Sequence, residues 1–176
     1  MTINPTELLY CVDENNIPIQ PVERQVAHRD KVWHRVSHIW VVSDKGRILC
    51  QRRSMKKDQS PGVWEPFFGG HYGPDIEAID AALTELKEEL GLNCDKEMLK
   101  PLLVHKAPRA TEFQYSFVVH NIPEHTKFNL EVDEVDATKW MDIPKLKVAI
   151  YDPQEQWSKE NREYELKCLQ IIEQGK

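Results

Sequence analysis

Hydrophobic positions recur along residues 78–90 with the spacing of one face of an α-helix. They lie at three- and four-residue steps and comprise Ile79, Ala82, Leu83, Leu86 and Leu90. Gly91 follows directly, where a left-handed residue commonly ends a helix. The pattern predicts an amphipathic helix over about residues 76–90, with Asp75 available as its N-terminal cap.

Stretches rich in β-branched and aromatic residues on both sides of this helix predict strands. The predicted strands cover residues 36–42, 47–53, 101–106, 113–120 and 135–141. The first two are joined by the turn sequence Ser43-Asp44-Lys45-Gly46, so they should form a β-hairpin.

The sequence Asp152-Pro153-Gln154-Glu155 combines a capping residue, a proline at the first helical position and a glutamate three residues after the cap. It predicts a C-terminal helix over about residues 153–174. No repeat or linker divides the chain, so we expect one domain over residues 1–176 with its core at about 30–150. The mixed order of strands and helices predicts an α+β fold of α/β/α layers.

Composition narrows the class of partner. The chain of 176 residues is 40% hydrophobic and 30% charged, with no apolar run near the ~20 residues that span a bilayer. The N-terminal residues lack the pattern of a secretory signal, so we expect a soluble cytoplasmic protein with no membrane partner. The net charge of −6 argues against binding long nucleic acids. Four separated cysteines without a CxxC pair predict packed, reduced thiols.

The predicted helix also carries a second, acidic face. Glu85, Glu88 and Glu89 lie within an arc of about 100° on a helical wheel. Neighbouring carboxylates at these spacings destabilise a helix by roughly 0.2–0.5 kcal/mol per pair unless a cation binds between them. Such a face is commonly only a solvated surface, but magnesium prefers carboxylate oxygens combined with water and substrate phosphate. The sequence therefore offers a candidate site for a divalent cation.

The segment from Gly70 to Leu92 resembles the Nudix box, in which a glycine and a glutamate precede the pattern Arg-Glu-apolar-any-Glu-Glu-any-Gly-apolar. The matching positions are Gly70, Glu85, Leu86, Glu88, Glu89, Gly91 and Leu92. Ile76 stands where the first glutamate is expected, and Thr84 replaces the arginine. The resemblance extends over about residues 5–150 and implies a Nudix-type α/β/α sandwich with a mixed sheet.

The resemblance implies a hydrolase that cleaves the diphosphate linkage of a small organic diphosphate with Mg²⁺ or Mn²⁺. The metal site would be formed by Gly70, Glu85, Glu88 and Glu89. A carboxylate would accept the proton of the attacking water, and Glu112, Glu134 and the three helix glutamates all remain candidates. Members of the family are often dimers, so a homodimer is a further expectation.

One branch of the family, which contains isopentenyl-diphosphate isomerase, has several similar segments. They are His34-Arg35, Cys50-Gln51-Arg52-Arg53-Ser54, Lys56-Lys57, Pro61-Gly62-Val63-Trp64 and Gly70-His71. Isomerases of this branch use a cysteine where this chain has Gly69, and a second glutamate where it has Gln114. Because neither residue can transfer a proton, we expect hydrolysis rather than isomerisation.

Basic and aromatic residues supply candidates for substrate binding. The candidate substrate-binding residues are His71 and four possible phosphate partners, Arg35, Arg52, Arg53 and Lys57. Arg52 and Arg53 alternate along one strand, so only one should reach the site. Trp64, Phe67 and Phe68 could form an apolar wall, although aromatic residues more commonly pack in the core.

Three histidines, His28, His34 and His71, could form a second metal site like that of the isomerase branch, although only His71 has useful sequence context. Thr84 leaves Glu85 without the arginine that would hold it in place. A catalytically reduced diphosphate-binding module is therefore the main alternative to a hydrolase, and the sequence does not select the substrate.

Overall fold

The computed structural model describes residues 7–57, 59–152, 156–159 and 162–175. The strands are β1 (Leu8–Leu9), β2 (Val22–Glu23), β3 (His34–Ser43), β4 (Ile48–Arg53), β5 (Trp64–Glu65), β6 (Phe68–His71), β7 (Leu99–Ala107), β8 (Glu112–Ile122) and β9 (Val135–Met141). The helices are α1 (Arg24–Arg29), α2 (Ala78–Leu90), α3 (Ile143–Ala149) and α4 (Arg162–Gln174), with a short 3₁₀ helix η1 (Lys96–Met98).

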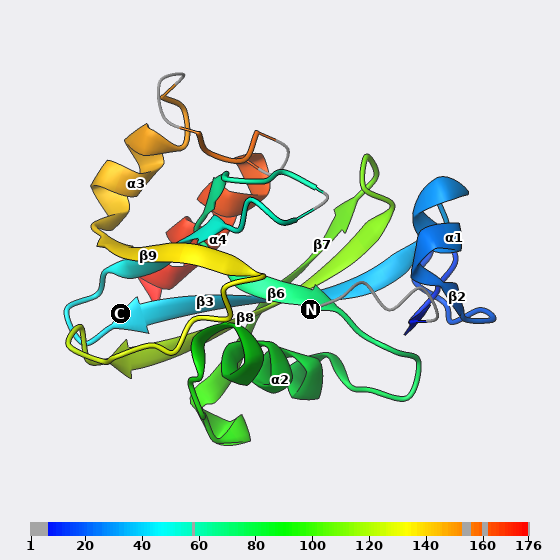
Figure 1. Ribbon diagram of the computed structural model, residues 1–176, viewed down its shortest axis with the longest axis horizontal. Coiled ribbons are helices and arrows are strands. Elements are labelled where there is room, and N and C mark those ends of the chain that lie inside the picture. The colour runs from blue at the N-terminus through cyan, green and yellow to red at the C-terminus, as the bar shows by residue number, and fades with distance from the viewer. Residues whose placement is uncertain (1–6, 58, 153–155, 160–161, 176) are drawn as a thin grey trace.

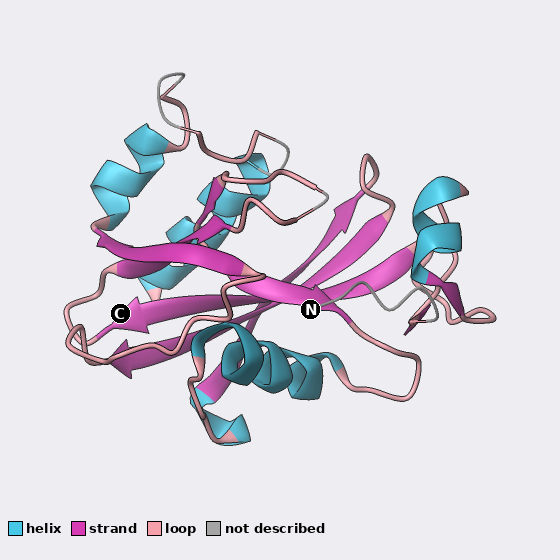
Figure 2. Ribbon diagram, in the orientation of Figure 1, coloured by secondary structure: helices cyan, strands magenta, loops and turns pink. Residues whose placement is uncertain are grey.

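A mixed sheet forms the middle layer. Within the described ranges it has seven strands in the order β5-β4-β3-β8-β7, with β6 paired to β3 and β9 paired to β4. Helix α2 covers one face, whereas α3 and α4 lie on the opposite side (Figure 1). Figure 2 shows the same layers by secondary structure, with α1, β1 and β2 at the end of the sheet where β3 begins. The expected α/β/α sandwich is confirmed.

Strand β3 is central to both layers of the core. It pairs in parallel with β8 and antiparallel with β4 and β6. Ile39 and Val41 pack in the core beneath α2, whereas Trp40 and Val42 pack in the core beneath α4. Because successive side chains of a strand point to opposite faces, one continuous hydrophobic run fills both layers.

The predicted strands and the predicted helix are present, with small differences at their ends. Helix α2 begins at Ala78, and its N-cap is Glu77 rather than Asp75, without a side-chain capping bond. The assignment of Asp75 as the cap is therefore wrong, because the chain enters the helix two residues later. At the other end, Gly91 has φ 65°, and its N–H donates to the carbonyls of Leu86 and Lys87 as expected.

The C-terminal helix begins later than its capping sequence predicts. Residues 156–159 are not helical, and the described part of α4 begins at Arg162. Trp157 is buried, and it forms a parallel bridge to Trp64 of β5. Extended pairing and burial of this tryptophan therefore outweigh the local helix signal. Residues 153–155 of the predicted start lie outside the described residues.

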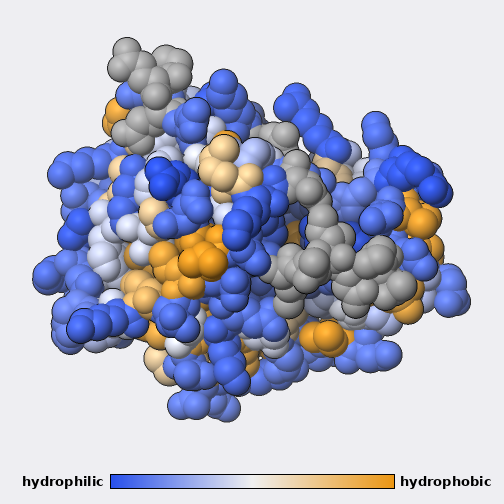
Figure 3. All heavy atoms as spheres, viewed as in Figure 1, coloured by the Kyte–Doolittle hydropathy of each residue, from blue (hydrophilic) through white to orange (hydrophobic). Residues whose placement is uncertain are grey.

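Surface and thiol properties agree with the composition. No helix within the described ranges is long and apolar enough to cross a membrane. Figure 3 shows one face of the molecule as mostly hydrophilic, with hydrophobic residues in patches between polar ones. The cysteines are free thiols, and Cys11, Cys50 and Cys168 are buried as expected.

Candidate active site

The three glutamates of α2 border one large cavity. Leu86 and Leu90 anchor the helix in the core, which turns Glu85, Glu88 and Glu89 toward the cavity; we call these three residues the acidic cluster. Glu88 is exposed, whereas Glu89 is only 5% exposed. The cavity has a volume of about 1060 Å³, which is large enough for a substrate and its ions.

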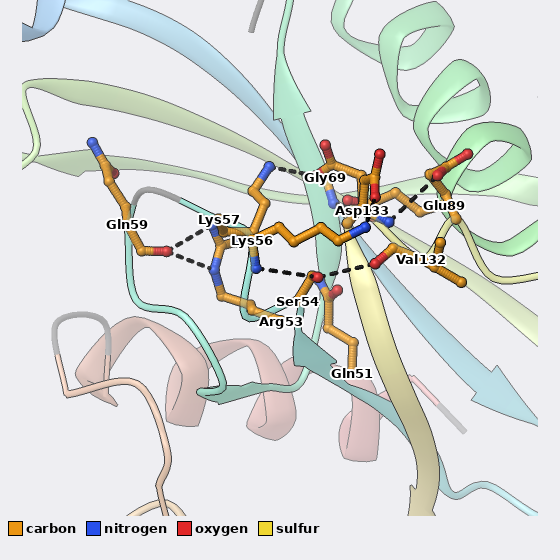
Figure 4. A network of polar contacts seen from close by, with 12 residues as sticks. Gln51, Arg53, Ser54, Lys56, Lys57, Gln59, Gly69, Glu89, Val132 and Asp133 are labelled. Carbon is orange, nitrogen blue, oxygen red and sulfur yellow. Dashed lines mark hydrogen bonds and ion pairs between the residues drawn. The ribbon is translucent and has the colours of Figure 1, made fainter. Parts of the chain in front are cut away.

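Two glycines of β6 allow the acidic cluster to approach the sheet. A Cβ atom at Gly70 would lie 2.4 Å from Oε1 of Glu85, so any side chain there would displace this carboxylate. The N–H of Gly69 donates to Oε2 of Glu89 at 3.2 Å (Figure 4). The sequence assigned Gly70 to the metal site; its observed contribution is space for Glu85, and it also lines the cavity.

Burial and mutual repulsion make two members of the acidic cluster, Glu85 and Glu89, difficult to ionise. Burial, together with repulsion from the nearby Glu88 and Glu134, raises the pKa of Glu85 to about 8. Burial also raises the pKa of Glu89 well above its usual value, together with repulsion from Glu85 and Glu134. Partly buried carboxylates without sufficient positive charge fit a magnesium or manganese ion, which would favour their ionised form.

The loop after β4 brings positive charge to this edge of the cavity. Lys57 contacts the carboxylate of Glu134, and Lys56 lies 2.5 Å from Asp133. The hydroxyl of Ser54 donates to the carbonyl of Val132 at 2.9 Å, which ties this loop to the segment before β9 (Figure 4). Lys57 and Glu134 both line the cavity, so the structure brings these two sequence candidates together.

A second group of candidate metal ligands lies at the start of β3. One nitrogen from each of His28, His34 and His71 lies within 4.8 Å of the other two. Oε1 of Glu112 lies 3.9 Å from Nε2 of His34, because β8 pairs Glu112 with His34. We call these four residues the histidine cluster.

Within the histidine cluster, His34 has the protonation state that a metal ligand requires. Nδ1 of His34 lies 2.8 Å from the carbonyl of Val32, which can only accept a hydrogen bond, so Nδ1 carries the proton. The opposite nitrogen, Nε2, is buried and has no hydrogen-bond partner. Burial lowers the pKa of His34 to about 4 and that of His71 well below its usual value, so both rings are neutral. An unpaired imidazole nitrogen beside a carboxylate fits a divalent metal such as Zn²⁺ or Mn²⁺.

Of the candidate arginines Arg35, Arg52 and Arg53, only one lines the cavity. The guanidinium of Arg35 donates to the side chain and carbonyl of Asn16 and lies 4.4 Å from the ring centre of Tyr10. Arg35 does not line the cavity, so the structure does not bring it to the site. Arg53 does line the cavity, whereas Arg52 lies on the other side of β4, over Trp64.

The other sequence candidates are also divided between the site and the core. Phe67 lines the cavity, whereas Phe68 is fully buried beneath α2 and Trp64 packs near Trp157. Thr84 is exposed, and its hydroxyl donates to the carbonyl of Asp80 rather than supporting a glutamate. Ile76 is 44% exposed, so it does not fill a pocket at the site.

Sequence reasoning missed three features of the cavity. Helix α1, which positions His28, was not predicted, because it has only six residues. His38 and Gln51 also line the cavity. The alternation of His34, Val36 and His38 along β3 was the available signal, since these residues share one face of the strand.

Comparison with known proteins agrees with this fold. The model of the NUDIX domain family matches residues 32–164. An isopentenyl-diphosphate Δ-isomerase from Burkholderia multivorans is 33% identical over 144 residues, covering 80% of each chain. Nudix hydrolase 3 from Arabidopsis thaliana is 32% identical over 130 residues, which cover 67% of this chain and 17% of that protein.

Solved structures show the same architecture. The crystal structure of DR0079 from Deinococcus radiodurans has a TM-score of 0.78 at 19% identity, covering 92% of this chain and 99% of that chain. The NUDIX domain of NrtR from Shewanella oneidensis, solved with ADP ribose, has a TM-score of 0.57 at 12% identity, over 81% and 88% of the two chains.

An α/β/α sandwich that holds glutamates of one helix against a large cavity defines the class of protein as one built on the Nudix fold. The chain belongs to the NUDIX domain family.

Proposed function

We propose that this protein is a magnesium- or manganese-dependent hydrolase of a small organic diphosphate. The observation that supports this proposal best is the acidic cluster, whose buried glutamates face a cavity that also contains Lys57. When bound there, the metal ion would neutralise phosphate charge and lower the pKa of a coordinated water. The residues that would hold it are Glu85, Glu88 and Glu89.

The other residues of the cavity would position the substrate. Lys57 and Arg53 carry the positive charge that complements phosphate oxygens. Glu112 and Glu134 line the cavity, so either could accept a proton from the attacking water, as could a glutamate of the acidic cluster. Cleavage adds this water across the phosphorus–oxygen bond and yields two phosphate-bearing products.

The test is an activity panel with purified protein and magnesium or manganese. Nucleotide sugars, dinucleotides, nucleoside triphosphates and prenyl diphosphates are compared for product formation. We expect metal-dependent cleavage of at least one class, which Glu89→Gln should abolish and the exposed Glu97→Gln should leave intact. Binding without cleavage across the panel would instead support the alternative of a diphosphate-binding module.

Isomerisation of isopentenyl diphosphate is the second candidate, because the histidine cluster is assembled and several relatives are named isomerases. Two features oppose it. A Cβ atom at Gly69 would lie 1.9 Å from the carbonyl oxygen of Ser37, so this backbone does not admit the cysteine of the isomerase branch. Gln114 is a neutral amide, which cannot exchange protons as a carboxylate does.

Solvent-deuterium exchange distinguishes isomerisation from hydrolysis. The protein is incubated with isopentenyl diphosphate in deuterated water, with magnesium together with manganese or zinc. We expect no incorporation of deuterium into carbon. Metal-dependent incorporation that disappears in Glu112→Gln would establish isomerisation and refute the hydrolase assignment.

A further inference from the structure

The rings of the histidine cluster differ in what holds them. His34 is buried on β3, and its Nδ1–H already donates to the carbonyl of Val32 at 2.8 Å. His28 is only half-buried and lies on α1, a helix of six residues. A histidine that binds a metal through one ring nitrogen almost always donates its other N–H to an acceptor. His28 therefore needs an acceptor of its own, as His34 has in Val32.

The loop after β4 brings a polar side chain to His28. Nε2 of Gln59 lies 3.3 Å from Nδ1 of His28. The other ring nitrogen of His28, Nε2, faces the cluster, since it lies 3.1 Å from Nε2 of His71. Gln59 and His28 both line the cavity, and Gln59 is exposed, so their contact joins the loop to α1 where the cavity meets solvent.

Arg53 holds the backbone of Gln59 in place. Its Nε and Nη2 donate to the carbonyl of Gln59 at 3.2 and 3.1 Å, and its Nη1 pairs with Glu65 at 3.4 Å. Figure 4 shows these bonds to the carbonyl, with the side-chain amide of Gln59 pointing away from Arg53. The next residue, Ser60, has φ 48°, a left-handed conformation that costs a residue other than glycine roughly 1–2 kcal/mol. Such a conformation persists where surrounding contacts determine the backbone, so this loop directs Gln59 toward α1.

The contact with Gln59 defines the tautomer of His28. An amide nitrogen donates and does not accept, so Nδ1 of His28 is the acceptor. Burial lowers the pKa of His28, so its neutral ring carries one proton, which is then on Nε2. Nε2–H donates to Nε2 of His71. In this tautomer the nitrogen of His28 that faces the cluster has no lone pair for a cation.

A divalent cation requires the other tautomer of His28. The lone pair of Nε2 becomes available when the proton is on Nδ1, and Nδ1–H then needs an acceptor. The amide of Gln59 carries an oxygen beside its nitrogen, so a half-turn about its last side-chain bond presents that oxygen to Nδ1. Gln59 can therefore support both tautomers, whereas a carboxylate would support only the second.

We propose that Gln59 is a positioning residue for the histidine cluster. Its side chain orients His28 and exchanges its donor for its acceptor when His28 passes from the tautomer that bonds to His71 to the tautomer that binds a divalent cation. Arg53 fixes the loop from which Gln59 acts. This inference goes beyond the proposed hydrolysis, because it concerns the histidine cluster and does not depend on the acidic cluster.

Cobalt titration of the whole chain measures the effect on affinity, with excess magnesium present to occupy the acidic cluster. Gln59→Leu should weaken cobalt binding about 10-fold, at the lower end for partners of metal ligands, because water can replace part of this exposed bond. Gln59→Glu keeps an acceptor for Nδ1–H and should bind cobalt at least as tightly as the parent protein does.

Gln25 provides the matched controls, because it is an exposed glutamine on α1 that also lines the cavity. Gln25→Leu should leave the affinity for cobalt unchanged. Gln25→Glu measures how much an added negative charge alone raises this affinity, and that factor is subtracted from the result for Gln59→Glu.

Proton–nitrogen correlation NMR of the imidazole rings reports the tautomer directly, with the signals of His28 assigned from a His28→Gln variant. We expect the Nε2–H tautomer in the parent protein before zinc is added and the Nδ1–H tautomer afterwards. Gln59→Glu should show the Nδ1–H tautomer even before zinc is added, because a carboxylate can only accept. A residue 59 that merely packed against the ring would not change the tautomer.

Four outcomes would overturn the inference. Equal cobalt affinity in Gln59→Leu and the parent protein would show that Gln59 does not support His28. Binding in Gln59→Glu as weak as in Gln59→Leu would show that the acceptor is not what matters. An unchanged tautomer of His28 in Gln59→Glu would show that residue 59 does not bond to the ring, and absence of cobalt binding in the parent protein would remove the site. Because Gln59 is exposed, its variants should fold like the parent protein, and melting temperatures check this.

Discussion

The acidic cluster and the histidine cluster border the same cavity but are built in different ways. A single helix positions Glu85, Glu88 and Glu89, whose spacing of three and four residues is sufficient to place them together. The histidine cluster takes its residues from α1, β3, β6 and β8, which are distant in the sequence. The comparison shows that a helix brings ligands together locally, whereas a sheet does so through strand register.

The two clusters also differ in charge, and this difference predicts different cations. The acidic cluster offers only carboxylate oxygens, which suit magnesium. The histidine cluster offers neutral imidazoles and the single carboxylate of Glu112, which suit zinc, cobalt or manganese. Mutations in one cluster should therefore change the response to one kind of metal and not to the other.

The largest expected effect is that of Glu89→Gln in the acidic cluster. Loss of this carboxylate should reduce magnesium-dependent hydrolysis on the order of 100-fold or more, because it removes a ligand beside the reacting phosphate. It should also remove the rise in melting temperature that magnesium produces in the parent protein. A preserved rate and a preserved magnesium response in Glu89→Gln, both equal to those of the Glu97→Gln control, would refute the assignment.

The second effect concerns the histidine cluster. His34→Gln should weaken cobalt or zinc binding about 10- to 100-fold, because it removes the buried imidazole nitrogen that faces Glu112. The magnesium response should persist. The absorption spectrum of bound cobalt measures this change, and the exposed His125→Gln provides the control. Since His34 is buried, the half-buried His28→Gln is tested in parallel, and unchanged cobalt spectra in both variants would contradict a metal site here.

The third effect concerns Glu165, a buried carboxylate that does not belong to the acidic cluster. Both oxygens of Glu165 are buried without partners, and burial raises its pKa to about 8, with Glu65 adding repulsion. A raised folded-state pKa means that stability is greatest below the ordinary pKa near 4.5 and is lost as pH rises toward 8.

Glu165→Gln should therefore stabilise the protein at neutral pH by about 1–3 kcal/mol, since each pKa unit corresponds to about 1.4 kcal/mol. The free energy of unfolding should also fall less between pH 5 and pH 8 than it does in the parent protein. Urea unfolding at several pH values measures this change. Magnesium should offset the alkaline loss that arises from Glu85 but not the part that arises from Glu165. If magnesium removes the whole pH dependence of stability in the parent protein, then Glu165 does not contribute to it and the prediction is wrong.

The smallest effect is expected from restoring the Nudix arginine. Thr84→Arg could form a charge-assisted hydrogen bond with a glutamate of the acidic cluster and raise turnover about 2- to 10-fold, most of all together with Ile76→Glu. Both positions are exposed, so neither change meets a packed core. A double-mutant cycle under saturating magnesium measures the coupling. Equal turnover in all four proteins would mean that the close approach of Gly70 already positions Glu85 sufficiently.

Local patterns predicted those parts of the molecule that depend on neighbours in the sequence. The stripe that includes Leu86 and Leu90 predicted α2, and Gly91 predicted its end, because helical geometry depends on residues a few positions apart. The same helical spacing predicted that the three glutamates of the acidic cluster lie on one face of α2. The helix signal at Asp152 failed for residues 156–159, because burial of Trp157 against β5 is a tertiary effect.

The sequence by itself determined the central helix and the three glutamates on one of its faces, because these follow from short-range spacing. Its resemblance to the Nudix box implied the fold. Only the tertiary structure decided that His28 and His34 join His71 and that Arg35 binds Asn16 away from the cavity. Those outcomes depend on which strands pair and in what register, and strand register is set by contacts between residues far apart in the chain.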